Sequence, residues 1–505
     1  MTNRPNFLIL MADQLTARAL SAYGNKIART PHIDGLAAEG VVFDAFYCNS
    51  PLCAPSRFSF LSGRHVSAIG AYDNAAEFPA QVPTFAHYLR RAGYQTILSG
   101  KMHFCGADQL HGFEERLTTD IYPADFGWTP DWTRFELRPS WYHTMDSVTQ
   151  AGPCTRTNQI DFDDDVVFQA RQKLFDLARS KDRRPFCMVA SMTHPHDPYV
   201  IPQQYWDRYA GVEIDMPRVR MAADELDPHS RRLRHICGLD LTPVSETQVR
   251  DARRAYYGAV SYVDDQIGVL LKALHDARLD ADTVVLLLAD HGDMLGERGL
   301  WYKMSFFEPA CRIPLIVHAP TRFAAQRAPD AASLVDILPT LCELAGLEAA
   351  DYAGPLHGRS LAAQLAGNSG KDEVIGEYLA EGAIAPLVMI KRGRYKFVHS
   401  PVDPDQLYDL HEDPDELRNL AAAPLHAARV REFHAEVAGR WDLPALHAEV
   451  VASQQRRHLV YDALRKGRYV SWDFQPVRDA SRLYVRNDQD LGDLEAMARF
   501  PPFSG

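Results

Sequence analysis

The chain has 505 residues, of which 46% are hydrophobic and 24% are charged. These are ordinary values for a globular protein, and a chain of this length can bury a large core without disulfide bonds. Its formal net charge of −12 argues against a nucleic acid or an anionic membrane as a partner.

Eight cysteines are scattered along the chain, and none belongs to a Cys-x-x-Cys pair. This usage is typical of reduced thiols rather than of a disulfide framework. The apolar run at residues 7–12 is too short for a secretory signal, and no small-residue cleavage site follows it. No run is long enough to span a membrane, so we expect a cytoplasmic protein.

Short apolar segments alternate with helical segments through the first two-thirds of the chain. The sequence predicts strands at residues 6–12, 41–46, 95–99, 185–193, 283–289 and 314–318. It predicts helices at residues 31–39, 56–62, 83–92, 251–277 and 336–344. Continuous apolar strands that alternate with helices are typical of a mostly parallel sheet covered by helices on both faces.

The sequence pattern changes at a polar stretch around residues 367–372. We therefore expect an α/β catalytic domain at residues 1–368 and a smaller α+β subdomain at residues 369–505. The large sheet of the first domain should be mixed and mostly parallel, whereas the second domain should carry a small antiparallel sheet.

Three features are predicted within the C-terminal subdomain. Residues 387–391 and 395–399 flank a turn with a central glycine and predict a β-hairpin. A helix is expected at residues 426–441. The last segment, about residues 466–505, is rich in aromatic residues, arginine and aspartate without clear periodicity. It predicts an extended tail.

The strongest local signal is the segment Cys53-Ala-Pro-Ser-Arg57. The cysteine lies just ahead of a predicted helix N-terminus, where free N–H groups favour an anion, and Arg57 adds a positive charge. The ordinary alternative for such a thiol is a buried structural cysteine. A chance match to Cys-x-Pro-Ser-Arg is expected in only about a few chains per thousand of this length.

This segment resembles the sulfatase signature, in which the cysteine is oxidised to formylglycine. The enzyme that does so, a formylglycine-generating or other sulfatase-maturing enzyme, reads Cys-x-Pro-x-Arg. Other motifs of the sulfatase family follow in the expected order, so the resemblance covers nearly the whole chain. It implies an alkaline-phosphatase-like fold and hydrolysis of sulfuric esters, with Cys53 as the precursor of the nucleophile.

Two motifs follow predicted strands and carry metal-ligating groups. Asp13-Gln14 follows the first strand, and Asp290-His291 follows residues 284–289, at the sheet edge where open α/β folds place their sites. By similarity to sulfatases, these four residues and Cys53 hold one divalent cation. Many arylsulfatases have Asp and Asn in place of Gln14 and His291. Because this set of ligands carries less negative charge, the sequence does not fix the identity of the ion. Calcium is expected, and magnesium or manganese are the alternatives.

Three further blocks place cationic or proton-transferring groups after strand ends, at residues 100–103, 194–199 and 299–304. The resemblance assigns the following residues to catalysis: Cys53, Arg57, Lys101, His103, His196 and Lys303. His196 is preferred over His194 because the family motif is His-x-Pro, and His194 remains a candidate supporting group.

Within the family, the chain resembles the choline sulfatase group. The resemblance rests on Asp13-Gln14, on residues 126–132 and 193–199, and on tail segments at residues 471–476, 484–487 and 498–501. In that group the tail reaches a neighbouring subunit and helps close the active site. We therefore expect a homodimer or homotetramer that hydrolyses a small sulfate ester with a cationic head, namely choline-O-sulfate.

The expected substrate head requires a particular kind of pocket. A quaternary ammonium group cannot donate a hydrogen bond, and it is bound by aromatic faces and carboxylates. Trp128 is the predicted cage residue and Glu381 the predicted counter-charge, and Asn74 and His143 are expected to line the same pocket. Glu377 is the alternative to Glu381.

Two other functions remain open at this level. Phosphonate monoester hydrolases and phosphodiesterases share the formylglycine cysteine and an Asp-Gln…Asp-His set, but they act on a different leaving group. Alternatively, an unmodified Cys53 would leave a sensor that binds sulfate esters or metal. Lys101, His103, His196 and Lys303 argue against a sensor, because binding alone needs no proton-transfer groups.

Overall fold

The computed structural model describes residues 4–468 and residue 493. Its largest sheet has eight strands in the order β12-β2-β11-β9-β1-β7-β4-β5. Their bounds are β1 (Asn6–Ala12), β2 (Val41–Phe43), β4 (Gln95–Gly100), β5 (Glu115–Arg116), β7 (Phe186–Met192), β9 (Thr283–Ala289), β11 (Leu315–His318) and β12 (Gln326–Ala328). Only β11 is antiparallel to its neighbours, which confirms the predicted mixed, mostly parallel sheet.

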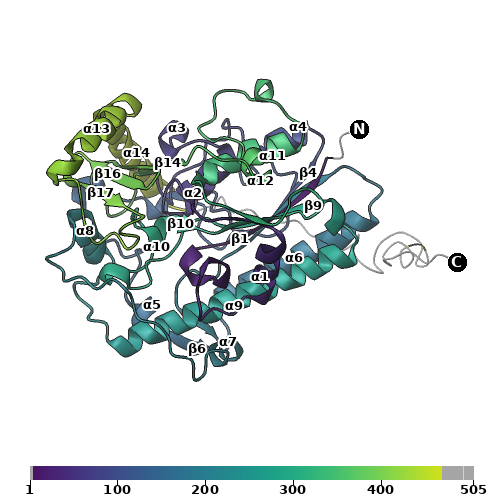
Figure 1. The fold of residues 1–505 in the computed structure, drawn as a ribbon, viewed down its shortest axis with the longest axis horizontal. Coiled ribbons are helices and arrows are strands. Elements are labelled where there is room, and N and C mark those ends of the chain that lie inside the picture. Colours follow the sequence, from purple (N-terminus) through teal and green to yellow (C-terminus); the bar gives the residue numbers. More distant parts are fainter. Residues whose placement is uncertain (1–3, 469–492, 494–505) are drawn as a thin grey trace.

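Helices cover both faces of this sheet (Figure 1). One layer contains α1 (Pro31–Glu39), α6 (Asn158–Arg179) and α9 (Glu246–Asp276). The other contains α2 (Cys53–Ser62), α4 (Phe85–Arg91) and α11 (Ile337–Leu344). Because both faces are covered, β7 and β9 are buried at every position, and their sequences are continuous apolar runs rather than alternating ones.

Some predicted elements differ from the observed ones. The single strand predicted at residues 41–46 is two strands, because Asp44 turns away to bind the Arg312 and Arg327 guanidinium groups. After this turn, β3 (Phe46–Tyr47) pairs in a separate small sheet with β10 (Arg312–Ile313) and β13 (Ala332–Ser333). The helix predicted at residues 56–62 begins at Cys53 itself.

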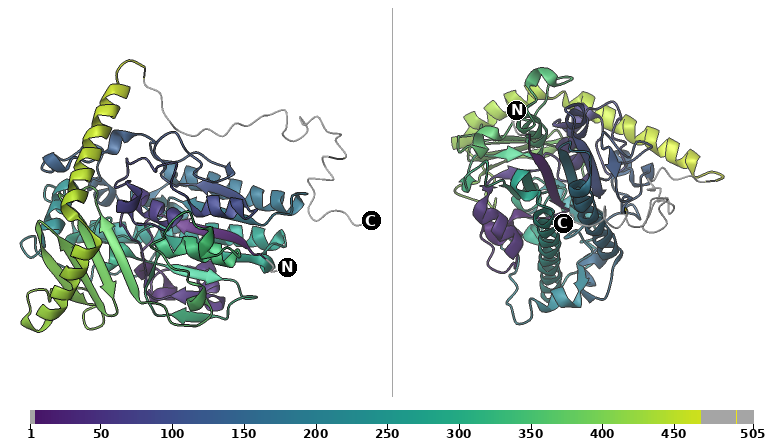
Figure 2. Two further views of the ribbon diagram at one scale, coloured as in Figure 1. Left: turned by 90° about the horizontal axis from the view of Figure 1, so that it is seen from above. Right: turned by 90° about the vertical axis from the view of Figure 1, so that its right-hand side faces the viewer.

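The C-terminal sheet has four antiparallel strands in sequence order. They are β14 (Glu373–Tyr378), β15 (Leu387–Arg392), β16 (Tyr395–Ser400) and β17 (Asp403–Asp409). The predicted hairpin is confirmed by the pairing of β15 with β16. Two helices follow, α13 (Ala427–Arg440) and α14 (Leu443–Leu464), and α14 crosses the molecule as one long rod (Figure 2).

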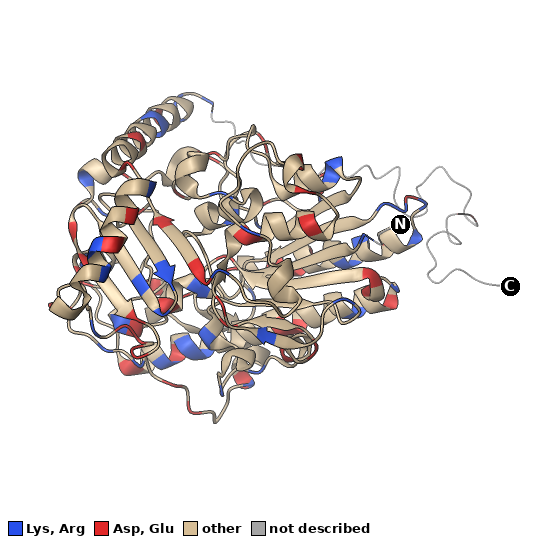
Figure 3. Cartoon of the chain, turned by 45° about the horizontal axis from the view of Figure 1, so that its top comes forward, with Lys and Arg blue, Asp and Glu red and all other residues tan. Residues whose placement is uncertain are grey.

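Acidic and basic residues are interspersed along the chain over most elements (Figure 3). All eight cysteines are free thiols. Within the described residues, no helix has the length and apolar character needed to cross a bilayer. The tail segments at residues 471–476, 484–487 and 498–501 lie outside the described residues.

Candidate active site

The site lies where neighbouring parallel strands end. Ala12 at the end of β1 is in register with Ala289 of β9, so Asp13 and Asp290 emerge side by side. On the other side of β1, strands β7 and β4 end at the same edge, and Lys101 follows β4 directly. The predicted convergence at one sheet edge is therefore observed.

Four side chains at this edge form an anionic cluster. The donor atoms of Asp13, Cys53, Asp290 and His291 all lie within 4.8 Å of one another. His291 Nε2 is 3.1 Å from Cys53 Sγ and 3.6 Å from Asp13 Oδ1. Its Nδ1 donates to the Gly292 carbonyl, so the Nε2 lone pair faces the Cys53 thiol and the Asp13 carboxylate. Two carboxylates and one neutral imidazole suit a divalent cation.

Arg57 links the two carboxylates of this cluster through hydrogen bonds. Its Nε donates to Asp290 Oδ2 at 2.8 Å, and its Nη2 donates to Asp13 Oδ2 at 3.0 Å. Its Nη1 donates to the Lys101 carbonyl and to Ser191 Oγ. The Lys101 ammonium pairs with the same Asp13 carboxylate. Two fully buried cations thus balance the two buried carboxylates.

Gln14 adjoins the cluster through its amide group. Its Nε2 donates to Asp293 Oδ2 at 2.6 Å, while its Oε1 accepts from Lys303 Nζ at 2.7 Å. Tyr199 donates to the same Asp293 oxygen. Asp293 therefore fixes the orientation of the amide, with its oxygen toward Lys303. The assignment of Gln14 as a metal ligand stays a prediction.

His103 presents an unengaged imidazole beside the nucleophile position. Neither ring nitrogen has a hydrogen-bond partner within the described part of the chain. Burial lowers the pKa of His103, although the neighbouring Cys53 thiol acts in the opposite direction. The Asp120 carboxylate fixes the loop by accepting from the backbone N–H groups of Met102 and His103. The arrangement offers a neutral base next to Cys53.

His196 and Lys303 form a hydrogen-bonded pair. His196 Nδ1 donates to the Asp197 carbonyl at 2.7 Å, so Nε2 accepts from Lys303 Nζ at 2.8 Å. Burial and the Lys303 charge hold the pKa of His196 well below its usual value. Burial lowers the pKa of Lys303, but the nearby Cys53 and carboxylates favour the charged ammonium. Their combined effect is larger than that of burial, so the pKa of Lys303 is raised. Lys303 is therefore the proton carrier of the pair.

The two other histidines of this region take different roles. His194 Nδ1 is bound at 2.6 Å by Asp163 of α6, so His194 supports the loop rather than joining Lys303. His143 stacks on Tyr302 with ring centroids 4.3 Å apart, and its Nδ1 lies 3.2 Å from Asp197 Oδ2. The structure thus brings His143 to the same carboxylate that adjoins His196.

Aromatic rings form one wall of the site. Trp128 lies 5.2 Å from Tyr122, 5.9 Å from His103 and 6.3 Å from Trp141 between ring centroids. The Lys101 ammonium lies 4.2 Å from the centre of the Tyr122 ring. The predicted cage residue Trp128 therefore lies beside His103, within a cluster of aromatic rings.

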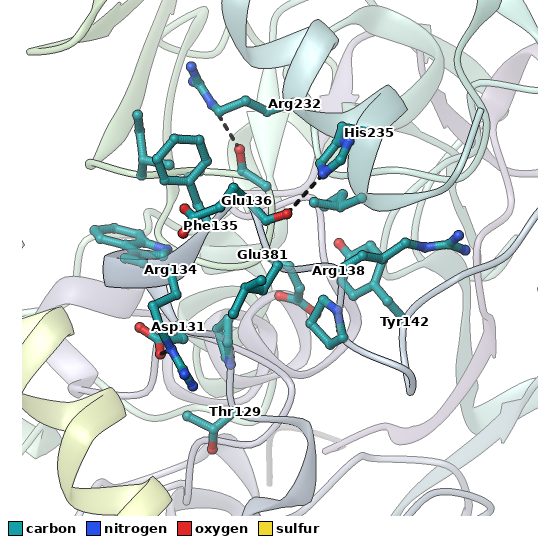
Figure 4. Close-up of a pocket in the computed structure, with 18 of the residues that line it drawn as sticks. Thr129, Asp131, Arg134, Phe135, Glu136, Arg138, Tyr142, Arg232, His235 and Glu381 are labelled. Atoms are coloured by element: carbon teal, nitrogen blue, oxygen red, sulfur yellow. Dashed lines mark hydrogen bonds and ion pairs between the residues drawn. The ribbon is translucent and has the colours of Figure 1, made fainter. Parts of the chain in front are cut away.

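Glu381 lies at the outer side of this wall. Only 5% of the surface of this residue is exposed to solvent. Its Oε2 has no hydrogen-bond partner among the residues described. It lines a cavity of about 590 Å³ together with Trp141 and Tyr142 (Figure 4). Burial raises the pKa of Glu381 to about 8, and the nearby Asp73 carboxylate acts in the same direction.

Glu377, the alternative to Glu381, is occupied elsewhere. Its Oε1 accepts from Ser67 Oγ and from Trp441 Nε1, and its Oε2 accepts from the Ser67 backbone N–H. These contacts join α3 (Val66–Ile69) to the end of α13. Glu377 is a structural link, whereas Oε2 of Glu381 has no hydrogen-bond partner among residues 4–468.

Asn74 and its neighbour connect the nucleophile to the C-terminal helix. Asn74 Oδ1 accepts from the Ala54 backbone N–H at 2.9 Å, at the start of α2. The adjacent Asp73 is buried and receives two hydrogen bonds of 2.6 and 2.7 Å from the Arg457 guanidinium of α14. Asn74 thus contacts the start of the helix that carries Cys53, and its predicted place in the substrate pocket stays a prediction.

Arg457→Met is expected to destabilise the protein by roughly 3–5 kcal/mol, because it leaves the Asp73 carboxylate buried without a partner. The displaced Asn74 should also lower kcat. Urea unfolding and steady-state kinetics measure the two effects. Arg456→Met is the matched control, since Arg456 is exposed on the same helix and should be neutral. Equal stability of both variants would contradict the proposed link.

The predicted set of site residues omits several groups that the structure brings together: Asp120, Tyr122, Asp197 and Asp293. Asp197 lies inside the block at residues 194–199, and Asp293 lies two positions after Asp290-His291, so both positions gave a usable signal. Asp120 and Tyr122 lie in an irregular loop without a motif, and only the tertiary contacts identify them.

Comparison with known families and sequences agrees with this geometry. The family model Sulfatase matches residues 5–347, and the model Choline sulfatase enzyme C terminal matches residues 448–500. A choline-sulfatase of Rhizobium meliloti (strain 1021) is 46% identical over 508 residues, which cover 99% of each chain. An uncharacterized sulfatase, YidJ, of Escherichia coli (strain K12) is 28% identical over 83% of each chain.

Solved structures share the architecture. The phosphonate monoester hydrolase of Agrobacterium radiobacter superposes with a TM-score of 0.69 at 24% identity, covering 88% of this chain and 96% of that chain. At this identity the likeness establishes the fold alone. The family match over most of the chain carries the assignment: the chain belongs to the sulfatase family and is a sulfuric ester hydrolase of that family.

Proposed function

We propose that this sulfatase hydrolyses choline-O-sulfate to choline and sulfate. The nucleophile is formylglycine made from Cys53. One divalent cation would be held by Asp13, Gln14, Asp290, His291 and the modified side chain. Calcium is the first choice for this ion, and magnesium or manganese are the alternatives. The donor set at the sheet edge fits such an ion, because its two carboxylates and the free His291 Nε2 face one point. When bound, the cation would act as a Lewis acid that acidifies a hydroxyl group.

The first step transfers the sulfuryl group to position 53. One hydroxyl of the hydrated aldehyde loses its proton to water and attacks sulfur, its O–S bond forms, and the ester S–O bond breaks. The charge that develops on the sulfuryl oxygens meets the Arg57, Lys101 and Lys303 side chains. Lys303 supplies a proton to the leaving alcohol and is held in place by His196.

The second step releases sulfate. The remaining hydroxyl at position 53 loses its proton to His103, the C=O bond reforms, and the C–O bond to sulfate breaks. His103 suits this role because its ring nitrogens are free and its pKa is lowered by burial, which keeps the imidazole neutral. Hydration of the aldehyde then restores the starting state.

The observation that carries the substrate proposal is the buried carboxylate of Glu381, which has no partner at Oε2 within the described chain. A buried carboxylate costs free energy unless a cation neutralises it. Aromatic faces at Trp128 and Trp141 adjoin this region, as recognition of a quaternary ammonium requires. The 46% identical relative named choline-sulfatase supports the same substrate.

The direct test is steady-state kinetics on choline-O-sulfate, an aryl sulfate and a phenyl phosphonate ester. We expect the highest kcat/KM on choline-O-sulfate. A higher value on the phosphonate ester would overturn the substrate proposal in favour of a phosphonate monoester hydrolase. Mass spectrometry of the peptide that contains Cys53 tests the modification, and an unmodified thiol in active protein would contradict the formylglycine mechanism.

The KM for choline-O-sulfate is expected to fall as the pH rises from about 6 to about 8, by up to about tenfold per unit, and then to level off. The pKa of Glu381 is raised to about 8, chiefly by burial. Its carboxyl is therefore mostly neutral below that pH, whereas the cationic head binds the ionised form. KM measured against pH should lose this trend in Glu381→Gln, and an unchanged trend would exclude Glu381 as its source.

We also propose that the chain divides near residue 368 and that its tail completes a homodimer or homotetramer. The family model that covers residues 448–500 supports a role for the tail. Truncation after Lys466 is expected to dissociate the oligomer or to raise KM. Light scattering after size exclusion and kinetics measure both, and an active monomer with unchanged KM would contradict the proposal.

A further inference from the structure

A second cluster of metal-ligating side chains lies in the four-stranded C-terminal sheet. It consists of His399 on β16, Asp405 on β17 and His434 on α13, whose donor atoms all lie within 4.8 Å of one another. Asp405 bridges the two rings, with Oδ1 2.7 Å from His399 Nδ1 and Oδ2 2.7 Å from His434 Nε2. Three elements thus converge on one point that the sulfatase chemistry does not use.

The charge and access of this cluster suit a cation. In the described chain, Asp405 has no Lys or Arg ion-pair partner, so its carboxylate charge is not already neutralised. Both histidines line a cavity of about 550 Å³, through which an ion can reach them. Arg440 lines the same cavity, but it is paired with Glu436 at 2.7 Å.

The supporting residues hold the donors in place. Phe397, which is fully buried, lies 6.3 Å from the His399 ring and 5.5 Å from the His434 ring between centroids. Asn419 donates to the Asp405 carbonyl and also accepts from the Leu407 backbone N–H, which fixes this part of β17. Such a supporting layer limits the rotamers available to the donors.

We propose that His399, Asp405 and His434 form a metal site for a zinc-like divalent ion, with water completing four-coordination. Two imidazoles and one carboxylate are the donors that such ions prefer, whereas calcium prefers oxygen donors alone. Tetrahedral bonds of about 2.0–2.1 Å place donor atoms about 3.3 Å apart. The two distances of 2.7 Å between Asp405 oxygens and the histidine nitrogens need to lengthen by only about 0.6 Å. The three side chains are partly exposed, so they have room for this movement.

The ion would tie α13 to the strands β16 and β17. It would therefore stabilise the C-terminal sheet, with no direct part in turnover at Cys53. The competing arrangement is a hydrogen-bonded His–Asp–His network that binds no metal. The two differ in metal affinity, so a binding experiment separates them whether or not the proposed substrate is correct.

The test is calorimetric titration of the full-length, calcium-saturated protein with Zn²⁺, followed by Tm measurement. Wild type is expected to bind one equivalent of zinc. The Asp405→Asn and His434→Ala variants should bind zinc more than about tenfold more weakly than wild type. Zinc should raise the Tm of wild type but not of these variants. Co²⁺ should give the visible bands of a four-coordinate site only in proteins that retain all three donors.

His411→Ala is the matched control, because His411 is an exposed histidine of the same region that pairs only with carboxylate Glu412. It should bind zinc like wild type. Asp405→Asn retains side-chain size, so it remains informative if His434→Ala fails to fold. Equal zinc stoichiometry and affinity in wild type, Asp405→Asn and His434→Ala would overturn the proposal and leave the hydrogen-bonded network.

Discussion

Cys53→Ser is expected to transfer one sulfuryl group and then stall, which lowers multiple turnover by at least about three orders of magnitude. A serine can attack sulfur, but its sulfate ester has no second hydroxyl whose ionisation would expel sulfate. Position 53 is buried at the start of α2, beside His291 and His103. The serine oxygen is smaller than the cysteine sulfur, so the substitution should leave the surrounding side chains in place. Rapid-mixing kinetics should show a burst of one equivalent of alcohol.

Mass spectrometry of the stalled enzyme should find one sulfuryl group on the peptide that contains position 53. Cys154→Ser is the control, since Cys154 is a partly exposed free thiol on β6 (Gly152–Cys154), outside the site. It should retain full turnover. Sustained turnover by Cys53→Ser at the rate of the modified protein would disprove release through a second hydroxyl.

Glu381→Gln is expected to lower kcat/KM for choline-O-sulfate by about 100-fold, equivalent to about 2.7 kcal/mol. The amide keeps the shape of the side chain but removes the charge that would neutralise the quaternary ammonium. Phenyl sulfate carries the same sulfate without the cation, so its kcat/KM should change by less than about threefold. The ratio of the two kcat/KM values is the quantity to measure.

Glu377→Gln provides the matched control for that substitution. Its carboxylate accepts three hydrogen bonds from Ser67 and Trp441, so loss of its charge should lower Tm. It should leave the ratio of kcat/KM values unchanged. A selectivity loss in Glu377→Gln, with none in Glu381→Gln, would reverse the assignment of the two glutamates.

The central strands could be predicted because their physical requirement is local. A strand buried on both faces needs an uninterrupted apolar run, and residues 6–12 and 283–289 are such runs. Helix α6 is absent from the predicted elements because the aspartates at 161 and 163–165 obscure the spacing of its apolar positions. Asp163 is explained only by tertiary partners, because its carboxylate accepts from the backbone N–H groups of Thr193 and His194.

The catalytic groups could also be anticipated, since each follows a strand end or stands in a family motif. Parallel pairing then requires Asp13 and Asp290 to emerge side by side. The supporting groups could not be anticipated in this way. Arg457 is 384 positions from Asp73, and no local pattern marks the pair. Tyr122 meets Lys101 and Trp128 only because an irregular loop folds over the sheet edge.

By itself, the sequence determined the sheet and the sulfatase-like motifs at its edge, because apolar runs and short motifs are encoded by neighbouring residues. Only the tertiary structure distinguishes Glu377 from Glu381, which lie four positions apart with the same side chain. The physical reason is the difference in partners: one carboxylate is saturated by Ser67 and Trp441, and the other is buried beside aromatic rings with an oxygen unpaired in the described chain. That difference makes Glu381 the residue proposed to select a cationic ester.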